Sequence, residues 1–440
     1  MEENNTSWVV HIKEQVEHLS ISNEDETWKK HSIYRLPMWC TDLHPQYSYK
    51  PQVVSFGPYH HGHPSLQPME EHKHRALIHF LKRTNKPIQT YLAELRNVGQ
   101  QLMDSYQQLD NKWRNMDRFL ELMMVDGCFM LEILYTTDGI GNNYASADPI
   151  FSSHGKLYNL PYIKRDMLMM ENQIPLLVLE RLVTIEKGVG KYEEFIHKQI
   201  LKFCTSNAKS IDMVGLGLHV LDVVRKSMLH VPHHHRARPW ATPSPLPSLP
   251  SFPTHPSTGE LIRSASELYE AGVRFKKSKS PSLRDVRFEA DGGILRLPVI
   301  VVDDTTGTTF LNLMAFERLH VGAGNEVTSY VCFMDNLVDS QKDVSLLHSK
   351  GIIQNALGSD KAAAKLFNQL SKDATLEPDS HLDDVQRKIN DYCKKRWNQW
   401  RANLVHTYFR SPWAFLSLLA AIFLLALTVI QTLYSVLSYY

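Results

Sequence analysis

Six histidines lie close together in VVSFGPYHHGHPSLQPMEEHKHRALIHFL, which covers residues 53–81. A protein zinc site needs four ligands, or three and an open position, at defined spacings. The stretch has no HExxH pattern and no cysteine pair, and a helix would bring only Glu70 or Glu71 beside His74. We therefore predict no metal ion and no cofactor here. The histidines are His60, His61, His63, His72, His74 and His79.

The same stretch has a simpler structural interpretation. Gly57 and Gly62 permit backbone angles that other residues disfavour, and Pro58 and Pro64 fix the direction of the chain. The imidazoles would then cap nearby backbone carbonyls, and a helix would begin after Pro68. We expect a turn that leads into a helix.

Acidic residues in apolar helical stretches are the second group that could do chemistry. Glu121, Asp126 and Glu132 lie in MDRFLELMMVDGCFMLEIL, where Glu121 and Glu132 share a helix face, and Glu171 lies in MLMMENQIPLL. Two carboxylates facing one cleft can act as general acid and base, so a hydrolase built on Glu132 and Glu171 is one hypothesis. The favoured interpretation is that they pair with arginines or backbone amides. Candidate arginines are Arg35, Arg118, Arg165 and Arg181.

Other catalytic patterns are missing from the sequence. It has no GxSxG nucleophile elbow, no GxxxxGK[ST] phosphate loop and no GxGxxG dinucleotide-binding turn. DDTTG, residues 303–307, resembles one aspartic-protease loop, but a second such loop is missing. We therefore name no catalytic residue, and we favour an interaction role over an enzymatic one.

The C-terminal residues 411–440 contain no charged side chain. An apolar helix of about 20 residues crosses the ~30 Å hydrocarbon core of a bilayer. We predict a transmembrane helix over residues 412–434, with Ser411 as N-cap, and a short tail over residues 435–440. Aromatic residues flank the helix, as they do at membrane interfaces. Lipid would contact it through Trp413, Phe415, Leu418, Ala421, Leu425, Val429 and Leu433.

The charges around this helix predict its orientation. Basic residues precede it and none follows it, and such residues favour the cytosolic side. The N-terminus has no basic stretch followed by an apolar one, so we expect no signal peptide. We predict a tail-anchored, single-pass protein of the plasma membrane with a cytosolic large domain, so the sequons at Asn4 and Asn5 would not be glycosylated. The basic residues are Lys394, Lys395, Arg396, Arg401 and Arg410.

The overall composition excludes some protein classes. The chain has 440 residues with 48 basic and 47 acidic side chains, so it lacks the basic excess typical of nucleic-acid binders. Its five cysteines are far apart and odd in number, which predicts free buried thiols instead of a disulfide scaffold. Acidic residues dominate the N-terminal segment, residues 1–30.

Apolar residues recur at helical spacing through most of the chain. We predict a single, mainly α-helical domain over residues 31–410. An acidic loop is expected after the first helix, and Asp343 is expected to cap the helix that follows it. The expected helices cover residues 8–19, 69–84, 88–110, 112–135, two short stretches within 160–183 divided before Pro175, 191–207, 212–229, 264–278, 308–320, 325–340, 343–350 and 360–371.

A last, long helix is predicted from Ser380 to Arg410, opened by a capping box of Ser380 and Asp383. Its apolar stripe runs from Leu382 to Tyr408 in three- and four-residue steps. Such a stripe either docks on the protein's own domain or pairs with a second chain. We favour docking on the domain.

One segment has a strong β-strand pattern. DVRFEADGGILRLPVIVVDD, residues 285–304, alternates apolar and polar side chains on both sides of Asp291-Gly292, which predicts an antiparallel β-hairpin. Residues 231–257 differ again, because eight prolines fall between Val231 and Pro256. We predict a disordered insertion there, with its PxxP units as an alternative ligand for an SH3-type module.

Several sequence blocks resemble the plant domain-of-unknown-function-247 family. They include IYRLP, VVSFGPYHHG, MEEHK, DMLMMENQIPLLVLERL and LRLPVIVVDDTTGTTFLNLMAFE. The resemblance covers about residues 31–430 and implies a plant protein with one mainly helical domain and a C-terminal membrane anchor. Some relatives are linked to pollen–pistil self-incompatibility and others to growth or defence. The family has no established catalytic residue, so none is transferred, and the insertion at 231–256 departs from its pattern.

Together these observations predict a mainly α-helical fold (α+β, with one small antiparallel β-hairpin) plus one C-terminal transmembrane helix. The favoured function is an interaction or signalling module held at a membrane, with an unknown protein partner and no nucleic acid. Two alternatives stay open: a recognition determinant with a non-cytosolic domain, and a hydrolase using paired carboxylates. The oligomeric state also stays open.

Overall fold

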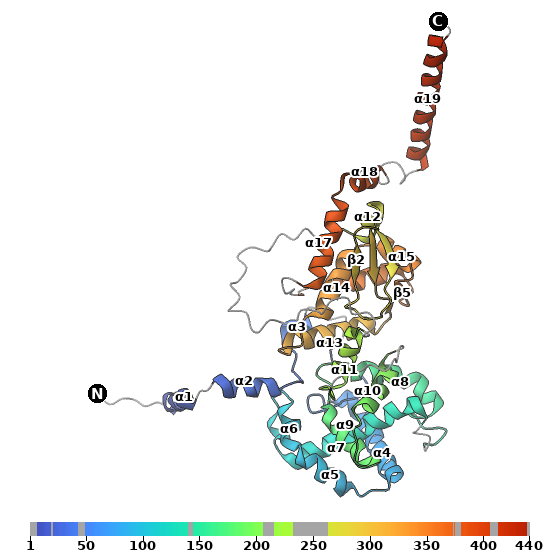
Figure 1. Cartoon of the computed structure of the whole chain (residues 1–440). Helices are drawn as coiled ribbons and strands as arrows, with labels where there is room; N and C mark the ends of the chain where they lie inside the picture. Colours follow the sequence, from blue (N-terminus) through green and yellow to red (C-terminus); the bar gives the residue numbers. More distant parts are fainter. Residues whose placement is uncertain are drawn as a thin grey trace, which may run out of the picture. The chain divides into compact units, whose positions relative to one another are not determined.

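A computed structural model describes residues 7–18, 21–42, 49–139, 144–205, 215–231, 263–372, 374, 380–404 and 412–437. The chain forms two compact units whose segments alternate along the sequence. Unit 1 comprises Met1–His230 and Thr305–Val327, and unit 2 comprises Val231–Asp304 and Thr328–Tyr440. Both are mainly helical, as predicted, and the named strands of the described residues lie in unit 2 (Figure 1).

The described residues of unit 1 form helices and three short 3-10 turns. These are α1 (Ser7–His18), α2 (Ile21–Lys30), α3 (Met38–Asp42), η1 (Pro64–Leu66), α4 (Gln67–Thr84), α5 (Ile88–Asn97), α6 (Gly99–Asp104), η2 (Asn111–Trp113), α7 (Met116–Tyr135), η3 (Thr136–Asp138), α8 (Ser153–Met167), α9 (Leu176–Lys187), α10 (Glu193–Cys204), α11 (Val220–Leu229) and α13 (Thr306–Leu319).

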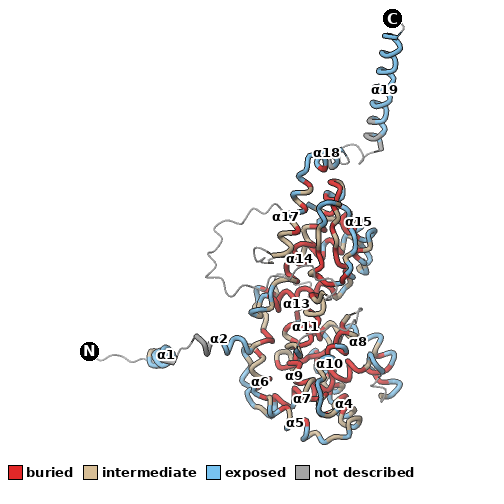
Figure 2. The backbone as a smooth tube through the Cα atoms, viewed as in Figure 1, coloured by how far each residue is buried: buried red, intermediate tan, exposed pale blue. Residues whose placement is uncertain are grey.

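Helix α7 forms the core of unit 1. Every residue from 122 to 135 is buried, and α7 packs against α4, α5, α9 and α10 (Figure 2). A helix that is apolar on all sides is typical of such a surrounded position. Gly127 allows the close approach of α9, because a Cβ atom there would lie 2.8 Å from side-chain atoms of Val178 and Leu182.

Unit 2 combines two small sheets with helices. In the larger sheet the strand order is β1–β3–β2, with β1 parallel and β2 antiparallel to β3, and in the smaller sheet β4 and β5 are parallel. The strands are β1 (Arg274–Lys277), β2 (Arg287–Glu289), β3 (Ile294–Leu297), β4 (Ile300–Val302) and β5 (Ile353–Asn355). The helices are α12 (Ala265–Glu270), α15 (Gln341–Ser349), α16 (Asp360–Leu370), α17 (His381–Cys393), α18 (Arg396–Leu404), α19 (Pro412–Leu437) and most of α14 (Glu326–Leu337).

The predicted hairpin is confirmed as β2 and β3. Phe288 lies opposite Leu295, and the chain reverses over residues 290–293, where Gly293 has a φ of 60°. The hairpin is not the only β-structure, because β1 and β5 were not expected. Residues 300–302, predicted as part of the second hairpin strand, instead form the separate strand β4, which pairs with β5. Parallel strands join segments far apart in the sequence, so local periodicity does not reveal them.

Several predicted segments differ in the structure, and the helix predicted over residues 212–229 begins only at Val220. The expected acidic loop after α1 is helix α2. The helix predicted over residues 264–278 ends at Glu270, because Gly272 adopts a φ of 102° and the chain continues into β1. The helix predicted over residues 88–110 divides into α5 and α6, which begins at Gly99.

The long helix predicted from Ser380 also divides. Its capping box is confirmed, because the backbone N–H of Ser380 donates to Asp383 Oδ2 at 2.8 Å. Helix α17 then ends at Cys393 and α18 begins at Arg396, with Asn398 Nδ2 donating to the carbonyl oxygen of Tyr392 at 2.7 Å. Val385 and Ile389 in the α17 part of the apolar stripe are buried, and α17 packs on β2, whereas the α18 part is exposed. Residues 405–411 lie outside the described part of the chain.

Asp343 caps α15 differently from the prediction. Ser340 is the N-cap, and Asp343 is the third helical residue, whose Oδ2 accepts from the backbone N–H of Ser340 at 2.9 Å. The other oxygen of Asp343 accepts from the backbone N–H of Ser266 in α12 at 2.8 Å. One carboxylate therefore serves two helix N-termini.

The five cysteines are free and buried, as predicted. Almost all of the proline-rich insertion lies outside the described residues, as do the sequons at Asn4 and Asn5 and residues 438–440 of the tail. The predicted domain boundaries stay predictions.

Candidate functional site

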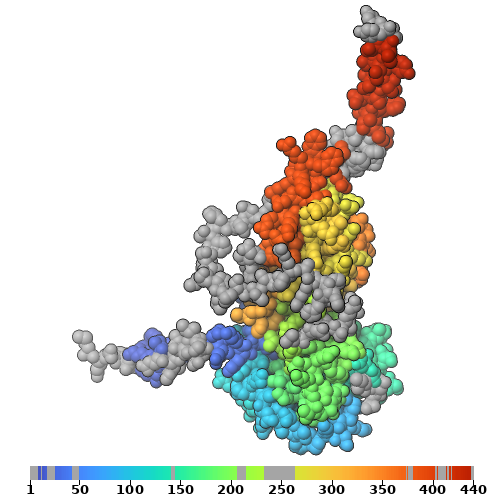
Figure 3. All heavy atoms as spheres, viewed as in Figure 1, coloured from blue at the N-terminus to red at the C-terminus, as the bar shows by residue number. Residues whose placement is uncertain are grey.

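Helix α19 is the candidate membrane site. Its segment Leu419–Leu437 is long and apolar enough to cross a membrane. No residue in the most apolar 18-residue stretch of this segment is buried. Large apolar side chains there are exposed to between 46% (Leu427) and 72% (Tyr434) (Figure 3). In a soluble domain, neighbouring elements would cover at least one apolar face of such a helix.

Most of the residues predicted to contact lipid are exposed on α19. They are Trp413, Ala421, Leu425, Val429 and Leu433. Phe415 and Leu418 lie in the same helix, but their side chains are outside the described part of the structure. Pro412 is the first helical residue, as expected for a proline at a helix start. Contact of these side chains with lipid stays a prediction.

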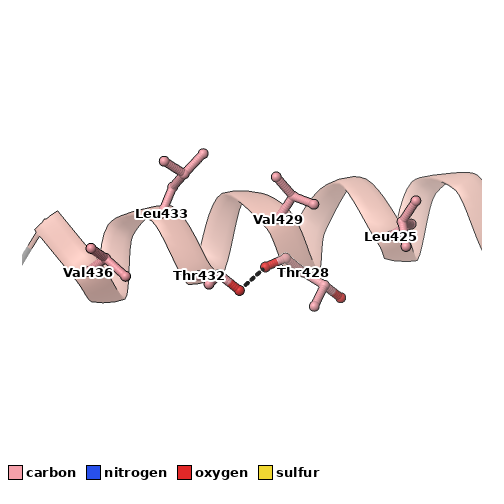
Figure 4. Close-up of a pocket in the computed structure, with 6 residues that line it drawn as sticks. All are labelled: Leu425, Thr428, Val429, Thr432, Leu433 and Val436. Carbon is pink, nitrogen blue, oxygen red and sulfur yellow. Dashed lines mark hydrogen bonds between the residues drawn. The ribbon is translucent and has the colours of Figure 1, made fainter.

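Two threonine hydroxyls of α19 are satisfied within the helix. Thr428 donates to the carbonyl oxygen of Leu424 at 2.8 Å. Thr432 donates to the carbonyl oxygen of Thr428, also at 2.8 Å (Figure 4). Such bonds lower the cost of placing a hydroxyl in hydrocarbon. The shallow hollow beside them belongs to this one helix and is lined by Leu425, Thr428, Val429, Thr432, Leu433 and Val436.

The loop before the histidines is held by buried polar side chains. Asp166 accepts hydrogen bonds from the backbone N–H groups of residues 52–54 at 2.7–3.1 Å. Asn172 accepts from the N–H of Phe56 at 2.7 Å and donates to the carbonyl oxygen of Val54 at 3.0 Å. Buried backbone groups need such partners where neither helix nor sheet supplies them.

Lys73 of α4 is a fully buried cation in the same region. Its Nζ lies 2.7 Å from Glu70 Oε1 and from Asp126 Oδ1, and donates to Ser55 Oγ at 3.1 Å. Asp126 Oδ2 accepts from the backbone N–H of Gly57 at 2.8 Å. Removing one partner of a buried ion pair leaves the other charge uncompensated, so these contacts fasten the loop to α4 and α7.

The six histidines have separate surroundings. His60 Nε2 lies 3.0 Å from Glu171 Oε2 without forming a hydrogen bond, and His61 Nδ1 lies 3.8 Å from Glu70 Oε2. His74 Nδ1 lies 2.9 Å from the carbonyl oxygen of Glu70, which is the predicted kind of contact. The others are His63 beside Ser65, His72 on α4 and His79 stacked on Tyr144. Among the described residues, no group of three or more His, Cys, Asp or Glu side chains could hold a metal ion.

Glu132 and Glu171 each have partners of their own. Buried Glu132 has Arg83 Nη2 at 2.5 Å from Oε1 and Tyr144 Oη at 2.9 Å from Oε2. Glu171 Oε1 accepts from the backbone N–H of Leu36 at 2.6 Å. The two carboxylates share none of these partners. The geometry therefore favours structural carboxylates over an acid–base pair.

A second polar cluster surrounds His219, the N-cap of α11. Its Nδ1 accepts from the backbone N–H of Asp222 at 3.2 Å, and its Nε2 donates to the carbonyl oxygen of Ser32 at 3.0 Å. These bonds require the neutral ring. Burial lowers the pKa of His219 to about 4, although Asp222 acts in the opposite direction.

The sequence analysis did not predict the structural roles of four of these polar residues, namely Lys73, Asp166, Asn172 and Arg83. The blocks MEEHK and DMLMMENQ carried a signal, because polar residues inside apolar helices are either exposed or paired. None of the four arginines proposed as partners pairs with Glu132 or Glu171 in the described contacts. Glu121, expected to share the face of Glu132, is exposed.

Comparison with known sequences places these residues in a family. The family described as "plant protein of unknown function", DUF247, matches residues 33–427. The chain belongs to this family. It is similar to the UPF0481 protein At3g47200 of Arabidopsis thaliana, with 32% identity over 433 residues covering 92% of this chain and 86% of that protein. It is also similar to the putative UPF0481 protein At3g02645 of the same plant, with 26% identity over 509 residues covering 97% and 94%. No solved structure matches the chain significantly.

The DUF247 match confirms the resemblance found in the sequence blocks. It begins at Ile33 and reaches Leu427, so it includes the polar clusters of unit 1 and more than half of α19. The family match therefore extends into the first part of the apolar helix.

Gly57 offers a test of how the loop is held. Its φ is 74°, and a Cβ atom there would lie 2.5 Å from the carbonyl oxygen of Gln173. We expect Gly57→Ala to lower the free energy of unfolding by about 2–5 kcal/mol, from backbone strain plus overpacking. Urea unfolding of the full-length chain in detergent, followed by near-UV circular dichroism, measures this. The control is Gly62→Ala, with a φ of 87° and open space around the Cβ, and equal losses in the two variants would contradict the prediction.

His219 makes the stability of unit 1 depend on pH. Between about pH 6.5 and pH 4 the unfolded chain binds a proton at this position that the folded chain excludes, so stability falls as pH falls. The slope from one such group is at most ~1.4 kcal/mol per pH unit. His219→Asn keeps an N-cap acceptor and should flatten the slope of the urea midpoint between pH 7 and pH 5. An unchanged slope in His219→Asn would refute the assignment.

Proposed function

We propose that α19 anchors this protein in a lipid bilayer and that the helical units act there as an interaction module with a role in signalling. The observation that carries the proposal is the uncovered apolar surface of α19. Burying a large apolar side chain gains about 1.5–3 kcal/mol, so a bilayer would stabilise this helix by tens of kcal/mol.

The surroundings of the polar residues support binding over catalysis. Glu132 is engaged by Arg83 and Tyr144, and the buried Lys73 connects Glu70 and Asp126. These groups hold the fold together, and each has a structural partner. We therefore propose a protein partner, not yet identified, and no substrate.

We further propose a cytosolic location for both units, at the plasma membrane. This proposal is supported by the basic residues that precede α19 and by the absence of charged side chains from residues 411–440. This orientation favours a signalling role over a recognition determinant outside the cytosol.

Removing α19 should release the protein from membranes. We expect the full-length chain to stay in the membrane fraction after alkaline carbonate extraction, and a chain ending before Ser411 to become soluble or to be extracted. Leu425→Arg with Val429→Arg should also weaken insertion, because each arginine costs about 2.5–3.5 kcal/mol near the helix centre. The control is Val189→Arg, at a fully exposed position of unit 1. Equal fractionation of the shortened and full-length chains would refute anchoring by α19.

Orientation can be tested with sealed microsomes carrying the full-length chain. Protease added from the cytosolic side should degrade both units, and Asn4 and Asn5 should stay without glycan. A sequon added after Tyr440 reports the other side and should be glycosylated if it is placed far enough from the membrane. Glycosylation at Asn4 or Asn5 would instead support the recognition role outside the cytosol.

A further inference from the structure

Helix α18 presents an aromatic face that unit 2 does not cover. Trp397, Trp400 and Leu404 are exposed to 78%, 75% and 46%. At ~100° per residue, these three positions fall within about 60° of one another around the helix. Asn398 lies on the opposite side, is buried and bonds to Tyr392. This aromatic face therefore points away from α12 and α17, on which α18 packs.

Basic side chains border the aromatic face. Arg396 and Arg401 lie on its two sides, and Lys394 and Lys395 precede the helix. All four are exposed, and α18 itself, with the sequence RWNQWRANL, has no acidic residue. Tryptophan faces flanked by cations are typical of helices that lie in the interface of anionic membranes.

Chain connectivity keeps α18 near the start of α19. Only residues 405–411 separate Leu404 from Pro412. A fully extended chain spans at most ~3.6 Å per residue, so the ends of the two helices are at most about 30 Å apart. That distance is similar to the thickness of one bilayer core. A surface fixed at the N-terminus of a membrane helix therefore stays within reach of the lipid headgroups.

We propose that the aromatic face of α18 docks into the headgroup layer of anionic phospholipids, in the same bilayer that α19 spans. Trp397 and Trp400 insert their rings at the interface, and Lys394, Arg396 and Arg401 contact lipid phosphates and carboxylates. This proposal rests on the anchoring function of α19. It adds a second contact that would hold unit 2 at the membrane surface and make its placement depend on lipid charge.

Quenching of tryptophan emission by brominated lipid tests the contact. The full-length chain is reconstituted in vesicles of phosphatidylcholine with 30% phosphatidylserine, with part of the phosphatidylcholine brominated near the glycerol end of its acyl chains. We expect Trp397→Phe with Trp400→Phe to lose a large part of the quenched emission. The matched control, Trp28→Phe with Trp39→Phe, changes two exposed tryptophans of unit 1 and should leave the quenched part unchanged.

The outcomes separate this proposal from the anchoring function. If the wild-type chain stays with the vesicles after carbonate treatment but its quenched emission does not depend on Trp397 and Trp400, only the docking of α18 is overturned. Emission shifted to the blue but not quenched would assign the aromatic face to a second copy or another protein, which also overturns it. If the chain leaves the vesicles, anchoring and docking are both overturned.

Charge reversal tests the anionic part of the proposal. Each cation near an anionic surface changes the docked-to-undocked ratio about fivefold, so Lys394→Glu with Arg396→Glu should reduce quenching of Trp397 and Trp400 strongly. Lys361→Glu with Lys365→Glu makes the same change of charge on exposed positions of α16 and should have little effect. Wild-type quenching should also fall in vesicles of phosphatidylcholine alone. Equal effects of the two charge reversals, or no effect of lipid composition, would overturn docking on anionic headgroups.

Discussion

Water is an unfavourable surrounding for α19, and this constraint governs how the rest of the chain is used. The helix has 26 residues, and its apolar side chains are exposed along the described length. A folded domain is stabilised by only about 5–15 kcal/mol, whereas burial of this apolar surface involves tens of kcal/mol. The environment of α19 therefore affects the free energy of the chain more strongly than any single contact within units 1 and 2.

Unit 1 is held together by buried polar clusters that join distant parts of its sequence. Lys73, Asp126 and Asp166 bind one loop from three different helices, mostly through backbone N–H groups. A loop fastened in this way has few alternative positions, because any shift would leave charges unpaired in the interior. The histidine-rich stretch follows directly from this loop, so its ordered conformation needs no bound metal to explain it.

Reasoning from sequence succeeds where one local pattern determines the outcome. Residues 122–135 form a core helix because apolar side chains occur on every side of it, and Ser380 begins α17 because its capping box satisfies backbone groups locally. It fails where the partner is distant. Arg83 pairs with Glu132 across 49 positions, and β4 pairs with β5 across three intervening helices, and neither pairing leaves a periodic signal.

The break between α17 and α18 shows how one sequence stripe can serve two surfaces. In a continuous helix, Val385 and Ile389 would lie within about 120° of Trp397 and Leu404, so one surface would cover them all. The chain instead ends the first helix at Cys393, and Asn398 bonds to the freed carbonyl oxygen of Tyr392. The first part of the stripe is thereby buried on β2, and the second part turns outward beside the basic residues. Helical periodicity alone does not distinguish these arrangements, because it indicates which side chains are apolar and not where the helix ends.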